Sequence, residues 1–196
     1  MIILKFVIVE DTGHEQSLQV NYLSTTLLSI LLLPILKAKG PFSGEPAHLT
    51  IVSAALALAA RFPNKAANPL LASFDDSKAS LPCLQAPGTH VSLEPYPTWC
   101  RGTGLGRDAR RAMKIFTKLF GLLDKTPKVG ASYFVDVVVN KGEESHGCFL
   151  MSWQIHPFAA LLYAPEGKEL TQCGWEETLA ELQFAGAHGI LESMKR

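Results

Sequence analysis

The most apolar stretch of the chain runs from Leu23 to Leu36, and it restricts the folds that this sequence can adopt. A bilayer span needs about 20 residues, whereas LSTTLLSILLLPIL has about 14, so the sequence predicts no membrane span. Pro34 interrupts the stretch and Gly40 follows as an end signal, which predicts one helix that begins near Ser17 or Asn21. Because this helix is apolar on nearly all sides, we expect a sheet on one face and, on the other, either the same subunit or a second copy of the helix.

The charge balance excludes partners that are recognised by a basic surface. The 196 residues include 18 Lys plus Arg and 18 Asp plus Glu, so the formal net charge is zero and no basic field attracts nucleic acid. Hydrophobic residues make up 47% and charged residues only 18%, which favours a folded, associating protein over a disordered one. The length and the lack of internal repeats predict a single domain over residues 1–196.

Cysteine and histidine spacing predicts an intracellular protein without a metal site. The four cysteines contain no CxxC pair, and the six histidines never occur at i and i+4 or in an HExxH string. The N-terminus, MIILKFVIVEDTGHE, has no basic region before its apolar residues, so we expect no secretory signal and a cytoplasmic location.

Alternating apolar and amphipathic segments favour an α/β fold with parallel strands. We expect strands over 2–9, 48–53 and 148–155, and helices through Leu36, from Asp108, over Val129–Val139 and over Glu166–Leu182. The last helix places Trp175, Leu179 and Leu182 on one face. Between about residues 64 and 97, prolines recur and neither the helical nor the strand periodicity of apolar residues persists, which predicts an irregular segment.

Two blocks of the chain resemble the short-chain dehydrogenase/reductase family, specifically fungal members similar to retinol-dehydrogenase-like enzymes. The first extends from about Glu15 to Asp76 and contains VNYLSTTLLSILLLPIL and HLTIVSAALA. The second extends from about Pro97 to the C-terminus and contains PTWCRGTGLGRDARRA and GKELTQCGWEETLAEL. The resemblance implies a partial Rossmann-like, doubly wound parallel sheet, the C-terminal half of such a domain, truncated at its N-terminus.

The resemblance also implies three site residues. Asn21 corresponds to the family's asparagine, which kinks a helix and holds a proton-relay water beside the cofactor. Ser53 takes the place of the serine that positions the substrate carbonyl, although the family's serine is commonly the second of two small polar residues, where this chain has Ala54. Thr103 corresponds to a contact with the carboxamide of NADP or NAD.

Two family motifs are not found in the sequence. No Gly-rich turn follows an opening strand, and GTGLG at 102–106 follows no convincing strand and is interpreted as a loop. The Tyr-x-x-x-Lys pair is also missing, since Tyr22, Tyr96, Tyr133 and Tyr163 are followed four residues later by Thr26, Cys100, Val137 and Gly167. Residues 79–96 resemble nothing in the family, and we hypothesise that a misread splice junction or frame change replaced the catalytic helix and the next strand there.

These observations leave two hypotheses of function. The first is an oxidoreductase that transfers a hydride between NAD(P) and a small-molecule carbonyl or alcohol, in fungal secondary metabolism. The second is a catalytically inactive remnant that at most pairs with intact relatives through the Leu23–Leu36 helix and the terminal strand; the same helix could also form a homo-oligomer. Asp75 and Asp76 are a further carboxylate pair, but adjacent acids on a loop more often cap a turn than share a proton.

Overall fold

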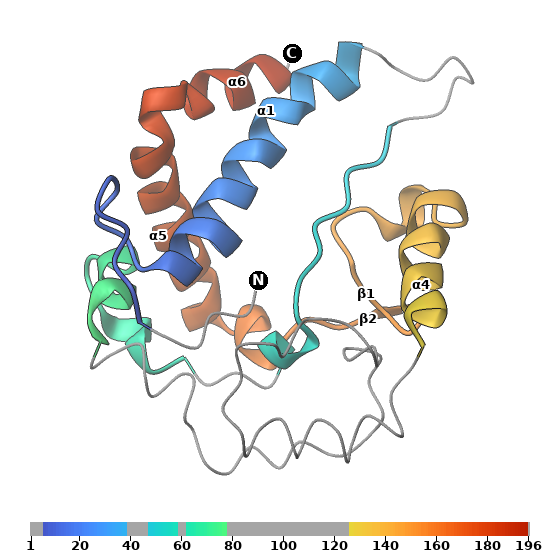
Figure 1. The fold of residues 1–196 in the computed structure, drawn as a ribbon, viewed down its shortest axis with the longest axis horizontal. Coiled ribbons are helices and arrows are strands. Elements are labelled where there is room, and N and C mark those ends of the chain that lie inside the picture. The colour runs from blue at the N-terminus through green and yellow to red at the C-terminus, as the bar shows by residue number, and fades with distance from the viewer. Residues whose placement is uncertain (1–5, 39–46, 59–61, 78–125, 196) are drawn as a thin grey trace.

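The computed structural model describes residues 6–38, 47–58, 62–77 and 126–195, and most of these residues are helical (Figure 1). The longer helices are α1 (Ser24–Ala38), α4 (Pro127–Val139), α5 (Pro165–Glu181) and α6 (Ala187–Met194). A π-helical turn (Leu18–Leu23) leads directly into α1, and short 3-10 helices occur at Ala55–Leu58, Pro63–Ala66, Leu71–Asp75, Glu143–Ser145, Ala160–Tyr163 and Leu182–Ala185. The predicted helices over 129–139 and 166–182 are confirmed within two residues.

The parallel strands that we predicted are not found in the described part of the chain. Its sheet is an antiparallel pair, β1 (Phe149–Met151) and β2 (Gln154–His156). The predicted strand over 48–53 is extended but belongs to no ladder, and Ile8 forms one isolated antiparallel bridge with Glu15. The start of the first predicted strand, the helix from Asp108 and the whole 79–96 segment lie outside the described residues.

The predicted helix through Leu36 is confirmed, and it is longer than its apolar stretch. Leu18–Ala38 is continuously helical over 21 residues and contains an 18-residue window of mean hydropathy 1.5, so by length and composition it could cross a membrane. Core helices of soluble proteins and signal sequences meet the same criterion, and the start agrees with the predicted one near Ser17 or Asn21. Within the single chain, the expected cover does not extend to Leu28 and Ile35, which are 57% and 49% exposed, and cover by a second copy of the helix stays a prediction.

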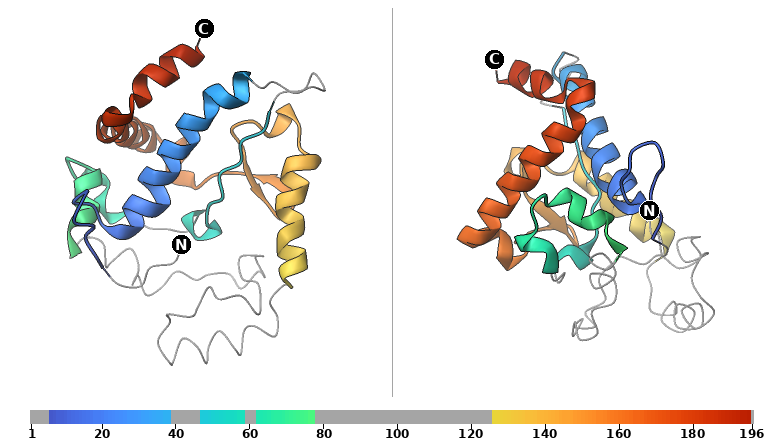
Figure 2. Two further views of the ribbon diagram at one scale, coloured as in Figure 1. Left: turned by 45° about the horizontal axis from the view of Figure 1, so that its top comes forward. Right: turned by 90° about the vertical axis from the view of Figure 1, so that its left-hand side faces the viewer.

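A small hydrophobic core joins α1, α5 and α6. Ile30, Leu182 and Ala187 are buried together, with Leu27, Leu179, Ile190 and Leu191 packed against them. Figures 1 and 2 show α6 beside the C-terminal half of α1, where Lys37 Nζ donates to the Met194 carbonyl at 3.4 Å. Leu179 and Leu182 therefore belong to the predicted core face of α5, whereas Trp175 remains exposed.

A second group of elements contains α4 and the β1–β2 hairpin (Figure 1). The segment predicted as one strand over 148–155 is this hairpin, because the chain reverses at Ser152 and Trp153, whose φ angles are 52° and 64°. Two consecutive positive φ values fit a type I′ turn, which usually contains Asn or Gly. The Trp153 ring stacks on Tyr133 with centroids 3.9 Å apart, and Lys141 Nζ donates to the Trp153 carbonyl at 2.9 Å.

Candidate functional site

The three residues predicted from the family resemblance lie in different segments. Asn21 is exposed in the π-helical turn before α1, where the extra residue per turn widens the backbone. Ser53 is exposed near the end of the extended segment, which runs between α1 and the hairpin in Figures 1 and 2. Thr103 lies outside the described residues. The roles assigned to all three residues remain predictions.

A carboxylate cluster surrounds the start of the helical segment that contains Asn21. The Glu15 side chain is 8% exposed and accepts from the backbone N–H groups of Ser17 at 2.7 Å and Leu18 at 3.2 Å. It therefore satisfies two of the donors that the first helical turn leaves without an intrahelical acceptor. The Glu15 N–H in turn donates to Asp75 Oδ1 at 2.6 Å, so a residue 60 positions away completes the cap.

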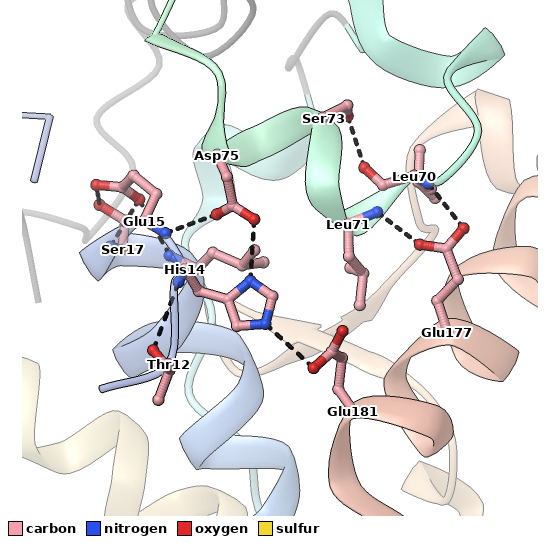
Figure 3. A network of polar contacts seen from close by, with 11 residues as sticks. Thr12, His14, Glu15, Ser17, Leu70, Leu71, Ser73, Asp75, Glu177 and Glu181 are labelled. Atoms are coloured by element: carbon pink, nitrogen blue, oxygen red, sulfur yellow. Dashed lines mark hydrogen bonds and ion pairs between the residues drawn. The ribbon is translucent and has the colours of Figure 1, made fainter. Parts of the chain in front are cut away.

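His14 lies between two carboxylates from separate elements (Figure 3). Its Nδ1 is 3.0 Å from Asp75 Oδ2, at the end of the 3-10 helix, and its Nε2 is 3.2 Å from Glu181 Oε2 on α5. Only 12% of the His14 side chain is exposed. Burial lowers the pKa of His14, but the hydrogen bonds and negative charges of Asp75 and Glu181 outweigh it, so the pKa is raised above its usual 6.5.

Two further contacts attach α5 to its neighbours. The Glu177 carboxylate accepts from the N–H groups of Leu70 and Leu71, each at 2.7 Å, and so caps the start of the 3-10 helix (Figure 3). Burial raises the pKa of Glu177, but these two bonds outweigh it and the pKa is lowered. Tyr22 and Thr178 share a hydroxyl–hydroxyl bond of 2.8 Å, which connects the π-helical turn to α5.

This arrangement does not fit the pyrophosphate of a dinucleotide. A helix N-terminus binds phosphate through free N–H groups and a positive dipole end. At the start of the Leu18–Ala38 segment, those N–H groups already bind the carboxylates of Glu15 and Asp75, whose charges would repel an anion. Among the residues that the structure describes, no group of three or more His, Cys, Asp or Glu side chains could bind a metal ion.

The sequence analysis missed His14, Glu15, Glu177 and Glu181, and it named Asp75 only as a member of an acid pair. Asp75 binds a backbone N–H group, as a cap does, but this group belongs to Glu15 before a remote helical segment and not to the turn of Asp75 itself. The capping partner could not be predicted because it lies 60 residues away. One local signal was available, because Glu15 precedes the helical segment and acidic side chains are favoured beside the positive end of a helix dipole.

Comparison with curated proteins finds fungal relatives that extend well beyond this chain. It is 47% identical over 212 residues to the short chain dehydrogenase/reductase mfmJ of Annulohypoxylon moriforme, with 98% of this chain and 61% of that protein covered. It is 33% identical to the short chain dehydrogenase virL of Hypocrea virens, with 97% and 62% covered, and 30% identical to the short-chain dehydrogenase fogG of Aspergillus ruber, with 95% and 60% covered. The chain thus spans about three fifths of the length of these relatives. No protein-family model and no solved structure matches it.

Proposed function

Since the chain belongs to the short-chain dehydrogenase/reductase family, we propose that it acts as an oxidoreductase on a small-molecule carbonyl or alcohol, with NADP or NAD as hydride carrier. The observation that carries the proposal is the 47% identity to mfmJ, which extends over 98% of this chain and includes the regions of Asn21 and Ser53. We further propose a role in fungal secondary metabolism, which the fungal origin of the relatives supports. The proposed location is cytoplasmic, as expected from the sequence.

The described residues support a limited share of this chemistry. Ser53 has an exposed position, and its hydroxyl can donate a hydrogen bond to a substrate carbonyl oxygen. Asn21 lies in a widened helical turn, where backbone carbonyl groups depart from the regular α-helical pattern and can bind water. The capped helix start does not fit the dinucleotide, so coenzyme binding would depend on residues outside the described ranges, such as Thr103.

The sequence limits the activity that we expect. No tyrosine of the chain has a lysine four residues later, so the usual phenol that exchanges a proton near neutrality is missing. A general acid or base contributes about 10²–10⁴-fold to a rate. We therefore expect turnover well below that of a relative that has the Tyr-x-x-x-Lys pair.

A coenzyme titration tests the proposal. Purified protein is titrated with NADPH and with NADH while the nicotinamide fluorescence is recorded, and the proposal expects saturation below about 1 mM. Turnover is then compared for wild type, Asn21→Ala and Ser53→Ala, with Ser193→Ala, an exposed serine on α6, as the matched control. A loss of turnover in Asn21→Ala and Ser53→Ala, but not in Ser193→Ala, supports the proposal. Absence of saturable binding for both coenzymes would contradict it.

A second candidate function is pairing with another copy through α1. Leu28, Leu31 and Ile35 are 57%, 41% and 49% exposed on this helix, which is an unusual cost for a monomer in water. A dimer would remove these three side chains of α1 from water, whether or not the chain is an active enzyme. Sedimentation of wild type and Leu31→Glu at several concentrations tests it, with Lys168→Glu on α5 as a control for charge. A wild type that remains monomeric at high micromolar concentration would argue against pairing.

A further inference from the structure

His14 is the point where three segments far apart in the sequence meet. It belongs to the turn before the Leu18–Ala38 helical segment, Asp75 ends the 3-10 helix, and Glu181 ends α5 (Figure 3). Each ring nitrogen faces a carboxylate oxygen, at 3.0 and 3.2 Å. A neutral imidazole has only one N–H, so it can donate to one of these carboxylates while its other nitrogen faces the second lone pair to lone pair. Both contacts are favourable together only when the ring is an imidazolium.

We propose that His14 is a pH-sensitive latch, which holds the start of the Leu18–Ala38 segment against the 3-10 helix and α5 when protonated and releases α5 when neutral. The latch does not depend on the proposed oxidoreductase function. It rests on the two nitrogen–carboxylate contacts and on the separation of their partners along the chain.

The charged groups around the latch favour its closed form. The two ion pairs that the described residues give to His14 are both with carboxylates. The carboxylate of Glu15, its neighbour in sequence, is held by the N–H groups of Ser17 and Leu18. Glu177, one turn before Glu181 on α5, is held by the N–H groups at the start of the 3-10 helix.

The sign of the pH dependence follows from the direction of the pKa shift. Burial lowers the pKa of His14, and the two carboxylates more than compensate, so its pKa in the folded protein lies above the usual 6.5. A group with a raised pKa stabilises the fold fully below its unfolded pKa, and this contribution is lost as the pH rises through the folded value. The latch is therefore closed in mild acid and opens towards alkaline pH.

Opening of the latch would weaken the attachment between α5 and the helical segment that contains Asn21. The Glu15 N–H and His14 Nδ1 bind the two oxygens of the same Asp75 carboxylate. A neutral His14 ring can donate to Asp75 alone, so loss of the imidazolium removes the bridge to Glu181 on α5, while the contact with Asp75 and the cap on the Glu15 N–H remain. The change should thus be a local loosening at the end of α5, without unfolding of the helix start.

An NMR titration tests the latch in the intact chain. The His14 ring and the Glu15 amide are followed from pH 5 to 9, with His146, an exposed histidine, as internal reference. We expect His14 to titrate above 6.5 and the Glu15 amide shift to follow the same curve, because both bind Asp75. A His14 ring that titrates at or below 6.5, or a Glu15 amide that does not follow it, would overturn the proposal.

Two variants separate the latch from a structural role. Glu181→Gln removes one carboxylate from a half-exposed position, so the protein should fold, and the pKa of His14 should fall. Glu169→Gln makes the same charge change on an exposed residue of α5, about 18 Å away along the helix, and should leave the His14 titration unchanged. Adding Asp75→Asn to Glu181→Gln leaves burial as the main influence, so the pKa of His14 should then fall below 6.5. Equal titration curves for wild type and Glu181→Gln would contradict the proposal.

Discussion

The hydrogen bond between Tyr22 and Thr178 offers a direct measure of how firmly the π-helical turn is attached to α5. The Thr178 side chain is fully buried, and its hydroxyl donates to the Gly174 carbonyl at 2.6 Å. A threonine hydroxyl has a single hydrogen. The Tyr22 hydroxyl must therefore donate to Thr178 Oγ1, across the 2.8 Å that separates them.

Replacing Thr178 with valine removes this acceptor and keeps the volume of the side chain. A neutral hydrogen bond contributes about 0.5–1.5 kcal/mol net. The Gly174 carbonyl retains its helical N–H partner, and Tyr22, which is 38% exposed, can still reach water, so neither group is left buried without a partner. We expect Thr178→Val and Tyr22→Phe each to lower the free energy of unfolding by about 1 kcal/mol, and the double variant to lose about 1 kcal/mol less than their sum.

Urea denaturation followed by far-UV circular dichroism measures these free energies, provided that the slopes with urea stay equal. The matched control is Thr171→Val, because Thr171 makes the same bond to a carbonyl four residues earlier, that of Gly167, at 2.8 Å. Thr171→Val should show no coupling with Tyr22→Phe. A coupling below about 0.3 kcal/mol between Tyr22 and Thr178, which is within the usual additivity error, would refute the reasoning.

Two further substitutions, Gly167→Ala and Glu177→Gln, test the packing and the charge of α5, and a third, on α6, is a control. Gly167→Ala should destabilise the protein by several kcal/mol, of the order seen for overpacking in tight sites, because a Cβ there would overlap the Leu161 carbonyl. Gly189→Ala on α6, where a Cβ meets nothing within 4 Å, should be neutral or stabilising by about 0.5–1 kcal/mol. A thermal melt compares the two, and equal melting temperatures would contradict the overlap. Glu177→Gln should reduce the loss of stability on acidification, because the lowered pKa of Glu177 adds stability above its usual 4.5 that disappears as the pH falls through the folded value. Denaturation midpoints from pH 7 to 3 measure this, and parallel curves for wild type and variant would show that Glu177 carries none of the dependence.

Helices with a periodic pattern of apolar residues were predicted well, whereas the chain reversal in the β1–β2 hairpin was not. The helices over 129–139 and 166–182 followed from the pattern of their apolar residues, whereas Pro127 and Pro165, which begin them in the structure, were not used as start signals. The hairpin was missed because Ser152 and Trp153 are not residues that usually mark a type I′ turn. Their positive φ angles are supported by contacts outside the hairpin, namely the stack on Tyr133 and the bond from Lys141, which no local pattern reveals.

The polar cluster around His14 could not be predicted either, because its members are far apart in the sequence. His14 and its partner Asp75 are 61 residues apart, and Glu181 lies on a helix near the other end of the chain. Each looks like an ordinary surface residue in its own segment, and only the packing of α5 and the 3-10 helix brings them together. Asn21 and Ser53 came from a resemblance, and their roles wait for the coenzyme experiment.

Both helix starts beside α5 take acceptors from remote parts of the chain, Asp75 for the N–H of Glu15 and Glu177 for those of Leu70 and Leu71. A synthetic peptide cut from the 3-10 helix region would lack Glu177, and its first turn should fray in water. A peptide that contains Glu15 and the helical segment after it would keep the local cap on Ser17 and Leu18 and would lose only the contact with Asp75. For the 3-10 helix, local order and docking on α5 should therefore appear and disappear together. A nascent chain leaving the ribosome could not complete the cap on the 3-10 helix until α5 had been synthesised.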